Sequence, residues 1–396
     1  MDFYKEALVR HEEAQGKIET VSKVAIETVD DLSVAYTPGV AEPCRKIAEN
    51  PEDAYRYTCK ANTIAVVSNG TAVLGLGNIG ATASLPVMEG KSVLFKRFGG
   101  VNAFPVCIDA KTPEEVIATV KAIAPSFGGI NLEDIKSPDC FEIETVLERD
   151  LDIPVFHDDQ HGTAVVVTAA LMNALKVVGK DISTAKIVLN GPGAAGTAII
   201  KMMQHAGAVD VTAVDEFGIL YVGRDPLPGH KEKLASETNP RDLRGSLADA
   251  LKGADVFVGV SVAGALKPEM IAEMASDPIV FAMANPTPEI GYDEAKAAGV
   301  AVMGTGRSDK PNQINNLLCF PGLFRGALAV RARDINYDMK LAAAQAISRL
   351  VSDEERNAEY IIPSALDPRV AQGVARAVAQ AAIDTGVARI AMPEDL

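Results

Sequence analysis

The chain has 396 residues, 48% of them hydrophobic, and it carries a formal net charge of −15 at pH 7. A chain of this length can bury a sizeable core and has room for two or three domains. The acidic balance argues against nucleic acid or an anionic membrane as the main partner, because both require a basic surface.

The N-terminal segment, MDFYKEALVRHEEAQGK, is charged and lacks the apolar stretch of a secretory signal. No run approaches the roughly 18 consecutive apolar residues that a membrane-spanning helix requires. The five cysteines are odd in number and include no C-x-x-C pair, which is typical of reduced thiols. We therefore expect a cytoplasmic protein without a membrane partner.

Short apolar runs alternate with helical patterns from about residue 60 to about residue 305. Such alternation predicts parallel sheets with helices on both faces. The expected strands are 63–67, 104–108, 153–156, 186–190, 211–215, 255–260, 278–283 and 300–304. The dipeptide Asn69-Gly70 joins two apolar runs, so it predicts a hairpin turn.

Several helix starts are marked by capping residues. Thr112 followed by Pro113 and two glutamates predicts a helix start, and Ser137-Pro138-Asp139 repeats the pattern. The run at 162–179 predicts a helix that links two α/β units. Near the end of the chain, Ala-rich amphipathic helices are expected at 341–351 and 369–384.

Two G-x-G-x-x-G runs occur, at 75–80 and at 191–196. A dinucleotide-binding turn also needs a strand before it, a helix after it, and an acid about 20 residues further on for the ribose hydroxyls. Only the second run meets these conditions, because Asp215 closes the next expected strand. The expected coenzyme-binding residues are therefore Gly191, Gly193, Ala194, Ala195, Gly196 and Asp215.

The residue after Asp215 bears on the choice of coenzyme. Glu216 adds a second carboxylate, and two carboxylates would repel a 2′-phosphate, which mildly favours NAD over NADP. Arg224 lies close enough in sequence to reverse this preference. The first glycine run is expected to be a tight turn that can line a substrate pocket.

Two acidic pairs, Glu133-Asp134 in GGINLEDI and Asp158-Asp159 in IPVFHDDQHGT, lie just after short apolar runs that are predicted to be strands. The carboxyl ends of parallel strands meet at one edge of a sheet, and converging carboxylates suit Mg2+ or Mn2+. The alternative is a set of solvated loop acids. His157 and His161 flank the second pair with zinc-like spacing, but no third ligand lies nearby, so we expect packing or supporting roles for both.

The sequence resembles the malic enzymes of the short bacterial type, from about Leu32 to about residue 385. The motifs that carry the resemblance follow one another in order: AYTPGVAEPC, VLGLGNIG, PVMEGKSVLFKRFGG, INLEDI, FHDDQHGTA, NGPGAAG, ANPTPE, TGRSDKPNQINN and FPG. The resemblance implies oxidative decarboxylation of malate to pyruvate and CO2, with NAD or NADP reduced and with Mg2+ or Mn2+ bound.

The resemblance also implies roles for individual residues. Tyr36 matches the general acid and Lys91 the general base, although neither residue would attract attention alone. The implied metal ligands are Glu133, Asp134 and Asp159, with Asp158 supporting the base; the implied substrate or nicotinamide contacts are Asn285, Asn315, Asn316, Gly75 and Gly77. Larger family members carry a substrate-binding arginine where this chain has Ala72, so another group must bind that carboxylate.

Taken together, we expect an α/β protein of two domains. The first (1–160) would bind substrate and metal, and the second (161–330) would be a doubly wound, Rossmann-type dinucleotide domain. Helices at 331–396 would pack back on the first domain or form a subunit contact. A homodimer or higher homo-oligomer is implied by the resemblance.

Three alternatives stay open at this point. A malolactic enzyme of the same family would keep NAD bound and release lactate. An amino-acid dehydrogenase shares the two-domain plan, but the acidic cluster argues against it. A coenzyme-binding regulatory protein without chemistry would not need Tyr36, Lys91 and all four acids.

Overall fold

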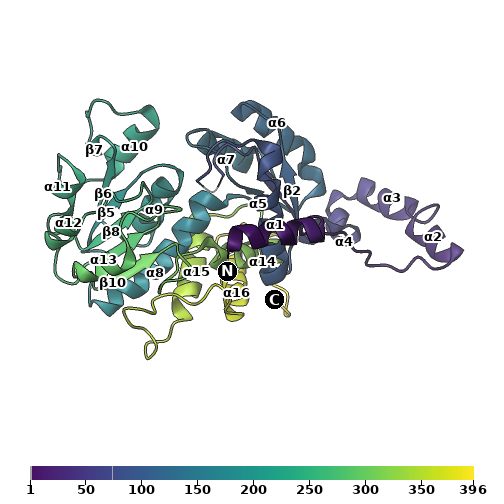
Figure 1. Ribbon diagram of the computed structural model, residues 1–396. Coiled ribbons are helices and arrows are strands. Elements are labelled where there is room, and N and C mark those ends of the chain that lie inside the picture. The colour runs from purple at the N-terminus through teal and green to yellow at the C-terminus, as the bar shows by residue number, and fades with distance from the viewer. Residues whose placement is uncertain (1, 74) are drawn as a thin grey trace.

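The computed structural model describes residues 2–73 and 75–396, except for the side chain of His230. Figure 1 shows two α/β units side by side, C-terminal helices beneath them, and an N-terminal arm that crosses the front. Each unit contains one sheet, with strand orders β2-β1-β3-β4 and β10-β9-β8-β5-β6-β7. This arrangement confirms the α/β fold with a separate Rossmann-type unit.

The first sheet is entirely parallel, and its central strands are buried along their whole length. Its strands are β1 (Thr63–Ser68), β2 (Asn102–Cys107), β3 (Gly129–Leu132) and β4 (Val155–His157). The helices of this unit are α5 (Ala81–Leu94), α6 (Pro113–Ile123) and α7 (Asp139–Asp150). Thr112 caps α6 with a capping box as expected, whereas α7 begins at Asp139 without a side-chain cap.

The hairpin predicted at Asn69-Gly70 is wrong. Strand β1 pairs with β2 and β3, both in parallel, and the described residues between Gly70 and α5 form no strand, only an isolated bridge between Val73 and Gly77. Gly70 adopts φ +69°, and a Cβ there would overlap the carbonyl of Gly80. The dipeptide therefore makes a compact loop that leads into α5 rather than a turn between strands.

The second sheet has five parallel strands and one short antiparallel edge strand. Its strands are β5 (Lys186–Asn190), β6 (Asp210–Asp215), β7 (Gly218–Ile219), β8 (Val256–Gly259), β9 (Ile279–Ala282) and β10 (Val302–Thr305). Its helices are α9 (Ala194–His205), α10 (Gly229–Glu237), α11 (Leu247–Leu251), α12 (Pro268–Ala272) and α13 (Tyr292–Ala297). The strand order reverses at β5, so a ligand crevice is expected at the carboxyl ends of β5 and β8.

A buried helix, α8 (Thr163–Val177), links the two units as expected. The C-terminal helices are α14 (Phe320–Ala329), α15 (Tyr337–Arg349) and α16 (Arg369–Asp384); α15 packs on α8, and α16 packs on both α14 and α15. Asn173 of α8 donates hydrogen bonds of 2.9 Å to the carbonyls of Ser348 and Ile361. A Cβ at Gly99 would lie 2.6 Å from the Pro321 carbonyl, so α14 also sits directly against the first unit.

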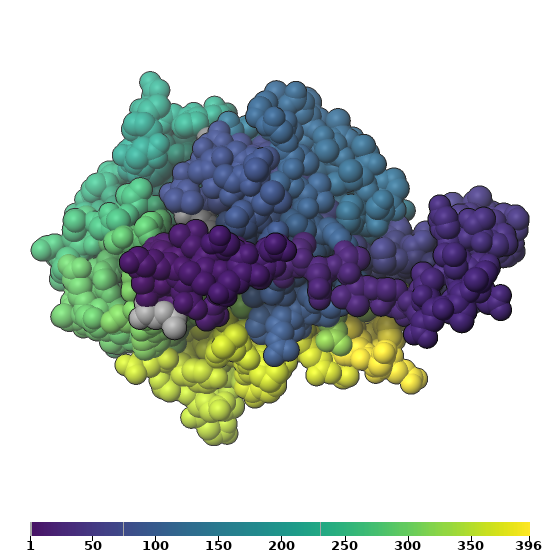
Figure 2. Space-filling view, turned by 45° about the vertical axis from the view of Figure 1, so that its right-hand side comes forward, coloured from purple at the N-terminus to yellow at the C-terminus, as the bar shows by residue number. Residues whose placement is uncertain are grey.

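The N-terminal arm, residues 2–62, contains no buried residue. It includes α1 (Phe3–Ala14), α2 (Val29–Ala35), α3 (Ala41–Glu49) and α4 (Ala54–Tyr57). Figures 1 and 2 show α2 and α3 projecting away from both sheets. Val29 and Val34 are 78% and 76% exposed, so this end of the arm presents apolar surface with no cover from its own chain.

Among the described residues, no helix combines the length and the apolar character needed to cross a bilayer.

Candidate active site

Carboxylates from two neighbouring strands converge at one edge of the first sheet. Glu133 and Asp134 follow β3, and Asp159 follows β4, which lies beside it. One oxygen from each of the three lies within 4.8 Å of the others. The Asp159 carboxylate also accepts a 2.8 Å hydrogen bond from the Asp134 amide, which holds the two loops together. The parallel register therefore brings these three acids together.

Lys91 lies at the inner side of this cluster. Its ammonium is 2.6 Å from Asp158 and 2.9 Å from Glu133, and its side chain is only 9% exposed. The amine also sits 4.3 Å above the ring of Phe320 on α14. Burial lowers the pKa of Lys91, but the two neighbouring carboxylates outweigh it and raise the pKa above its usual value. Lys91 is therefore a buried, ion-paired amine and not a solvated surface lysine.

Asp158 connects Lys91 to the C-terminal part of the chain. Its Oδ2 accepts hydrogen bonds from Lys91 at 2.6 Å and from the Asn316 amide at 2.5 Å. Its Oδ1 is buried and has no hydrogen-bond partner among the described residues. Burial raises the pKa of Asp158 to about 7, although Lys91 lowers it. This orphaned oxygen is what a polar ligand at the site would satisfy.

The electrostatic balance of the cluster fits a divalent cation. Burial raises the pKa of Glu133 to about 7 despite the neighbouring Lys91. The pKa of Asp159 is raised as well, first by burial and then by Asp158. Because burial is the main cause of both shifts, the ionised carboxylates are costly in this place unless a cation binds them. Three hard oxygen donors in such a place suit Mg2+ or Mn2+.

His157 and His161 are linked to the site through one buried carboxylate on α7. His161 contacts Glu144 of α7 at 3.0 Å, and the same carboxylate accepts a 2.8 Å bond from the His157 amide. Burial lowers the pKa of His157 to about 4, so its ring is neutral near pH 7. Sequence reasoning missed Glu144, although an acid beside the buried Ile143 and Leu147 on one helix face was the available signal.

Residues 15–148 match the family described as "Malic enzyme, N-terminal domain", and residues 160–383 match "Malic enzyme, NAD binding domain". The chain belongs to the malic enzyme family. It is 56% identical to the bifunctional malic/malolactic enzyme of Bacillus subtilis, over 100% of this chain and 97% of that protein. It is 59% identical to the NAD-dependent malic enzyme of Geobacillus stearothermophilus, over 94% of this chain and 78% of the relative. The solved malic enzyme from Pyrococcus horikoshii superposes with a TM-score of 0.92 at 50% identity, covering 98% of this chain and 93% of that one.

The glycine turn at 191–196, which the sequence predicts to be the coenzyme turn of this malic enzyme, joins β5 to α9. Gly191 has φ +97°, and a Cβ there would lie 2.6 Å from the Val260 carbonyl. A Cβ at Gly196 would overlap the Gly191 carbonyl, whereas one at Gly193 would meet nothing within 4 Å. The first and third glycines thus permit tight packing, and the second leaves the turn open. Helix α9 also packs on the Asp158–Gly162 turn, so the coenzyme turn borders the acidic cluster.

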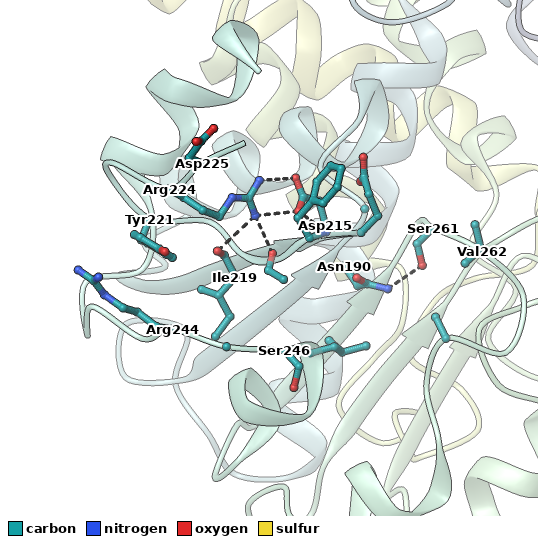
Figure 3. Close-up of a pocket in the computed structure, with 17 residues that line it drawn as sticks. Asn190, Asp215, Ile219, Tyr221, Arg224, Asp225, Arg244, Ser246, Ser261 and Val262 are labelled. Carbon is teal, nitrogen blue, oxygen red and sulfur yellow. Dashed lines mark hydrogen bonds and ion pairs between the residues drawn. The ribbon is translucent and has the colours of Figure 1, made fainter. Parts of the chain in front are cut away.

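A pocket of about 790 Å³ continues from this turn past the ends of β5 and β6 (Figure 3). Asp215 lines this pocket, but its carboxylate is bound by cationic side chains of the same chain. Its carboxylate accepts 2.7 Å bonds from both terminal nitrogens of Arg224 and a 2.7 Å bond from Lys231. Burial opposes ionisation, yet these donors hold the pKa of Asp215 below its usual value. Sequence reasoning anticipated Arg224 near this site but missed Lys231.

The remaining candidate residues divide between two locations. Asn316 belongs to the Lys91–Asp158 cluster, whereas the Asn315 side chain accepts the Leu317 amide at 2.9 Å and starts a 3-10 turn. The Gly75 loop faces the second unit, since a Cβ at Gly75 would lie 3.3 Å from the Asn285 carbonyl. A Cβ at Gly77 would meet nothing within 4 Å.

Two positions in this malic enzyme stand out against the expected arrangement. The Ala72 amide donates a 3.0 Å bond to the Asp134 carbonyl, so this position borders the acidic cluster without offering a cation. Tyr36 directly follows α2, and its side chain is 67% exposed. Figures 1 and 2 show α2 at the projecting end of the arm, away from α5, which carries Lys91. Within one chain, the structure does not bring Tyr36 to the cluster.

Proposed function

We propose that this protein catalyses the metal-dependent oxidative decarboxylation of (S)-malate to pyruvate and CO2, with reduction of NAD or NADP. In this proposal residues 1–160 bind substrate and metal, and residues 161–330 bind the coenzyme. The observation that carries it is the buried Lys91 between Asp158 and Glu133, at the edge of the three-carboxylate cluster. A buried amine beside a cation site is suited to proton abstraction from a bound hydroxyl.

We assign Glu133, Asp134 and Asp159 to the divalent ion. A divalent ion bound there would polarise the hydroxyl oxygen of malate, and a bound nicotinamide would supply the hydride acceptor. Lys91 takes the proton of the C2 hydroxyl, and Asp158 holds the amine in place through its 2.6 Å bond. Asn316, bonded to the same carboxylate, fixes the side chain of Asp158. When Glu133 is bound to a cation, its negative charge stabilises the protonated form of Lys91 less. The neutral amine, which can act as a base, is then easier to form.

We further propose that Tyr36 acts as general acid at C3, from a partner chain. The phenol is 67% exposed on an arm without buried residues, and the apolar Val29 and Val34 lie on the same helix. A second copy of the chain would cover this apolar surface and receive Tyr36 beside its own Lys91. A two-fold homodimer makes both sites alike, because each chain gives one arm and receives another.

A steady-state assay tests the reaction directly. Malate with NAD and Mn2+ should give net accumulation of NADH and stoichiometric pyruvate, and EDTA should abolish both. The same assay with NADP gives the coenzyme preference. Retention of full activity in EDTA after extensive dialysis would remove the metal from the proposal, and failure with both coenzymes would remove the reaction.

The malolactic reaction remains the second candidate. The Bacillus subtilis relative, 56% identical, is named as a bifunctional malic/malolactic enzyme. Lactate formed from malate without net NADH accumulation would assign this activity to the chain. Pyruvate formed in proportion to NADH would exclude it as the main reaction.

A further inference from the structure

The pocket at the end of β6 is where a Rossmann-type unit binds the adenosine ribose. Both oxygens of Asp215, the expected ribose ligand, already carry two donors each. Oδ1 accepts Arg224 at 2.7 Å and the Phe217 amide at 3.0 Å, and Oδ2 accepts Arg224 and Lys231, each at 2.7 Å. A carboxylate oxygen offers about two acceptor positions, so no position is left for a ribose hydroxyl.

The donors to Asp215 are themselves fixed in place. The Asp215 side chain is 1% exposed, that of Arg224 5%, and that of Lys231 10%. Arg224 also donates to the carbonyls of Gly218 and Ile219, which joins the β6–β7 hairpin to the same cluster (Figure 3). Release of Asp215 toward a ligand would leave buried cations without their partner, at a cost that one hydroxyl contact cannot offset.

The charge of this buried triad is not balanced. One carboxylate faces two cations, which leaves one excess positive charge beneath the pocket wall. The next residue, Glu216, lines the pocket with a side chain that is 67% exposed, and its carboxylate lies 3.7 Å from the Lys231 amine. Glu216 therefore offers free acceptor positions at the strand end that usually reads the ribose.

We infer that Glu216 reads the 2′ position of the adenosine ribose, and that Asp215 is a positioning residue that holds Arg224 and Lys231. This inference rests on the proposed function, because it takes the Gly191 turn as the coenzyme site. Glu216 accepts a hydrogen bond from a free 2′-hydroxyl and repels a 2′-phosphate by its charge. Without Glu216, the excess positive charge of the triad favours the phosphate.

Asp225 supplies a matched control within the same pocket. It is also an acidic, solvent-exposed residue of the lining. Figure 3 shows its carboxylate on the far side of Arg224 from Asp215. Removal of Asp225 takes away the same unit charge without touching the strand end, so it reports the general electrostatic effect alone.

The test measures binding of three adenosine probes by titration calorimetry, to the full-length chain and to Glu216→Ala and Asp225→Ala. The probes are AMP, 2′-deoxy-AMP and 2′,5′-ADP, which share one 5′-phosphate and differ only at the 2′ position. We expect the wild type and Asp225→Ala to bind AMP at least about tenfold more tightly than either other probe, the size of one charged hydrogen bond. In Glu216→Ala, the preference for AMP over 2′-deoxy-AMP should fall to within about threefold, and 2′,5′-ADP should bind at least as tightly as AMP.

Each other outcome has a defined meaning. If the differences persist in Glu216→Ala, or if the wild type does not discriminate among the probes, Glu216 is not the reader and the inference is overturned. If Asp225→Ala loses the same discrimination, the effect comes from the overall charge of the pocket, and the inference is overturned as well. If no probe binds the wild type, the Gly191 turn is not the coenzyme site, and the proposed coenzyme placement fails first.

Discussion

Mixing two inactive variants tests whether Tyr36 serves the site of a partner chain. One variant carries Tyr36→Phe and the other Lys91→Ala, so each homodimer lacks one proton-transfer group at both sites. General acids and bases contribute roughly 10²–10⁴-fold to a rate, so each variant alone should retain about 1% of wild-type turnover or less.

The expected recovery follows from the position of Tyr36 on the projecting arm. Random pairing of two co-expressed chains makes about half of the dimers mixed. In a mixed dimer, the chain with intact Lys91 receives an intact Tyr36, and the opposite site lacks both groups. One site of every mixed dimer is native, so the isolated mixed dimers should recover roughly one half of wild-type activity, and the unfractionated population roughly one quarter.

The assay is steady-state NADH formation from malate, on mixed dimers isolated through two different affinity tags. As a control, Lys91→Ala is paired with Glu133→Gln, whose side chain contacts Lys91 at 2.9 Å in the same chain. Each site of that mixed dimer carries one defect, so no recovery is expected. Activity of the Tyr36→Phe and Lys91→Ala pair that stays at the level of either homodimer would refute a partner-supplied Tyr36.

Three further predictions concern single positions. Lys91→Ala should lower kcat by about 10²-fold or more while NAD binding changes little, and exposed Lys96→Ala should leave kcat unchanged; equal turnover of both variants would contradict the base assignment. Gly196→Ala should raise the KM for the coenzyme at least about tenfold, because its Cβ overlaps the Gly191 carbonyl, whereas Gly373→Ala meets nothing within 4 Å and should be silent. Asn173→Ala removes two buried hydrogen bonds to the Ser348 and Ile361 carbonyls and one from the Ser348 hydroxyl, and should cost about 2–4 kcal/mol in urea unfolding; a loss below about 0.5 kcal/mol would exclude Asn173 as a structural link.

Hydrophobic periodicity and the position of polar residues at strand ends predict much of this structure. Alternation of apolar runs and helical patterns indicated both parallel sheets, and α16 has the bounds that its pattern predicted. The convergence of Glu133 and Asp159 followed from one rule, that neighbouring parallel strands present their carboxyl ends together. These features depend on local pattern and on generic sheet geometry, which a single sequence carries.

Features that depend on pairing across the fold were harder to predict. Lys91 is one of many lysines, and only its burial beside Asp158 sets it apart. Asp215 ends its strand as expected, but the position of Lys231 on α10, which occupies its second oxygen, has no local signature. Asn69-Gly70 has hairpin chemistry, yet the later strands that pair with β1, namely β2 and β3, do so in parallel.

The close approach of α14 to its neighbours has a consequence for how distant substitutions act. Gly322 allows the helix to touch α16, since a Cβ there would lie 2.6 Å from the Ala371 carbonyl. The preceding Phe320 supports the Lys91 amine. A bulkier residue between α14 and α16 would displace Phe320, and with it the ring that contacts the Lys91 amine, while leaving the fold intact. Random mutagenesis should therefore recover slow but well-folded enzymes from the last helix, far along the chain from any reacting group.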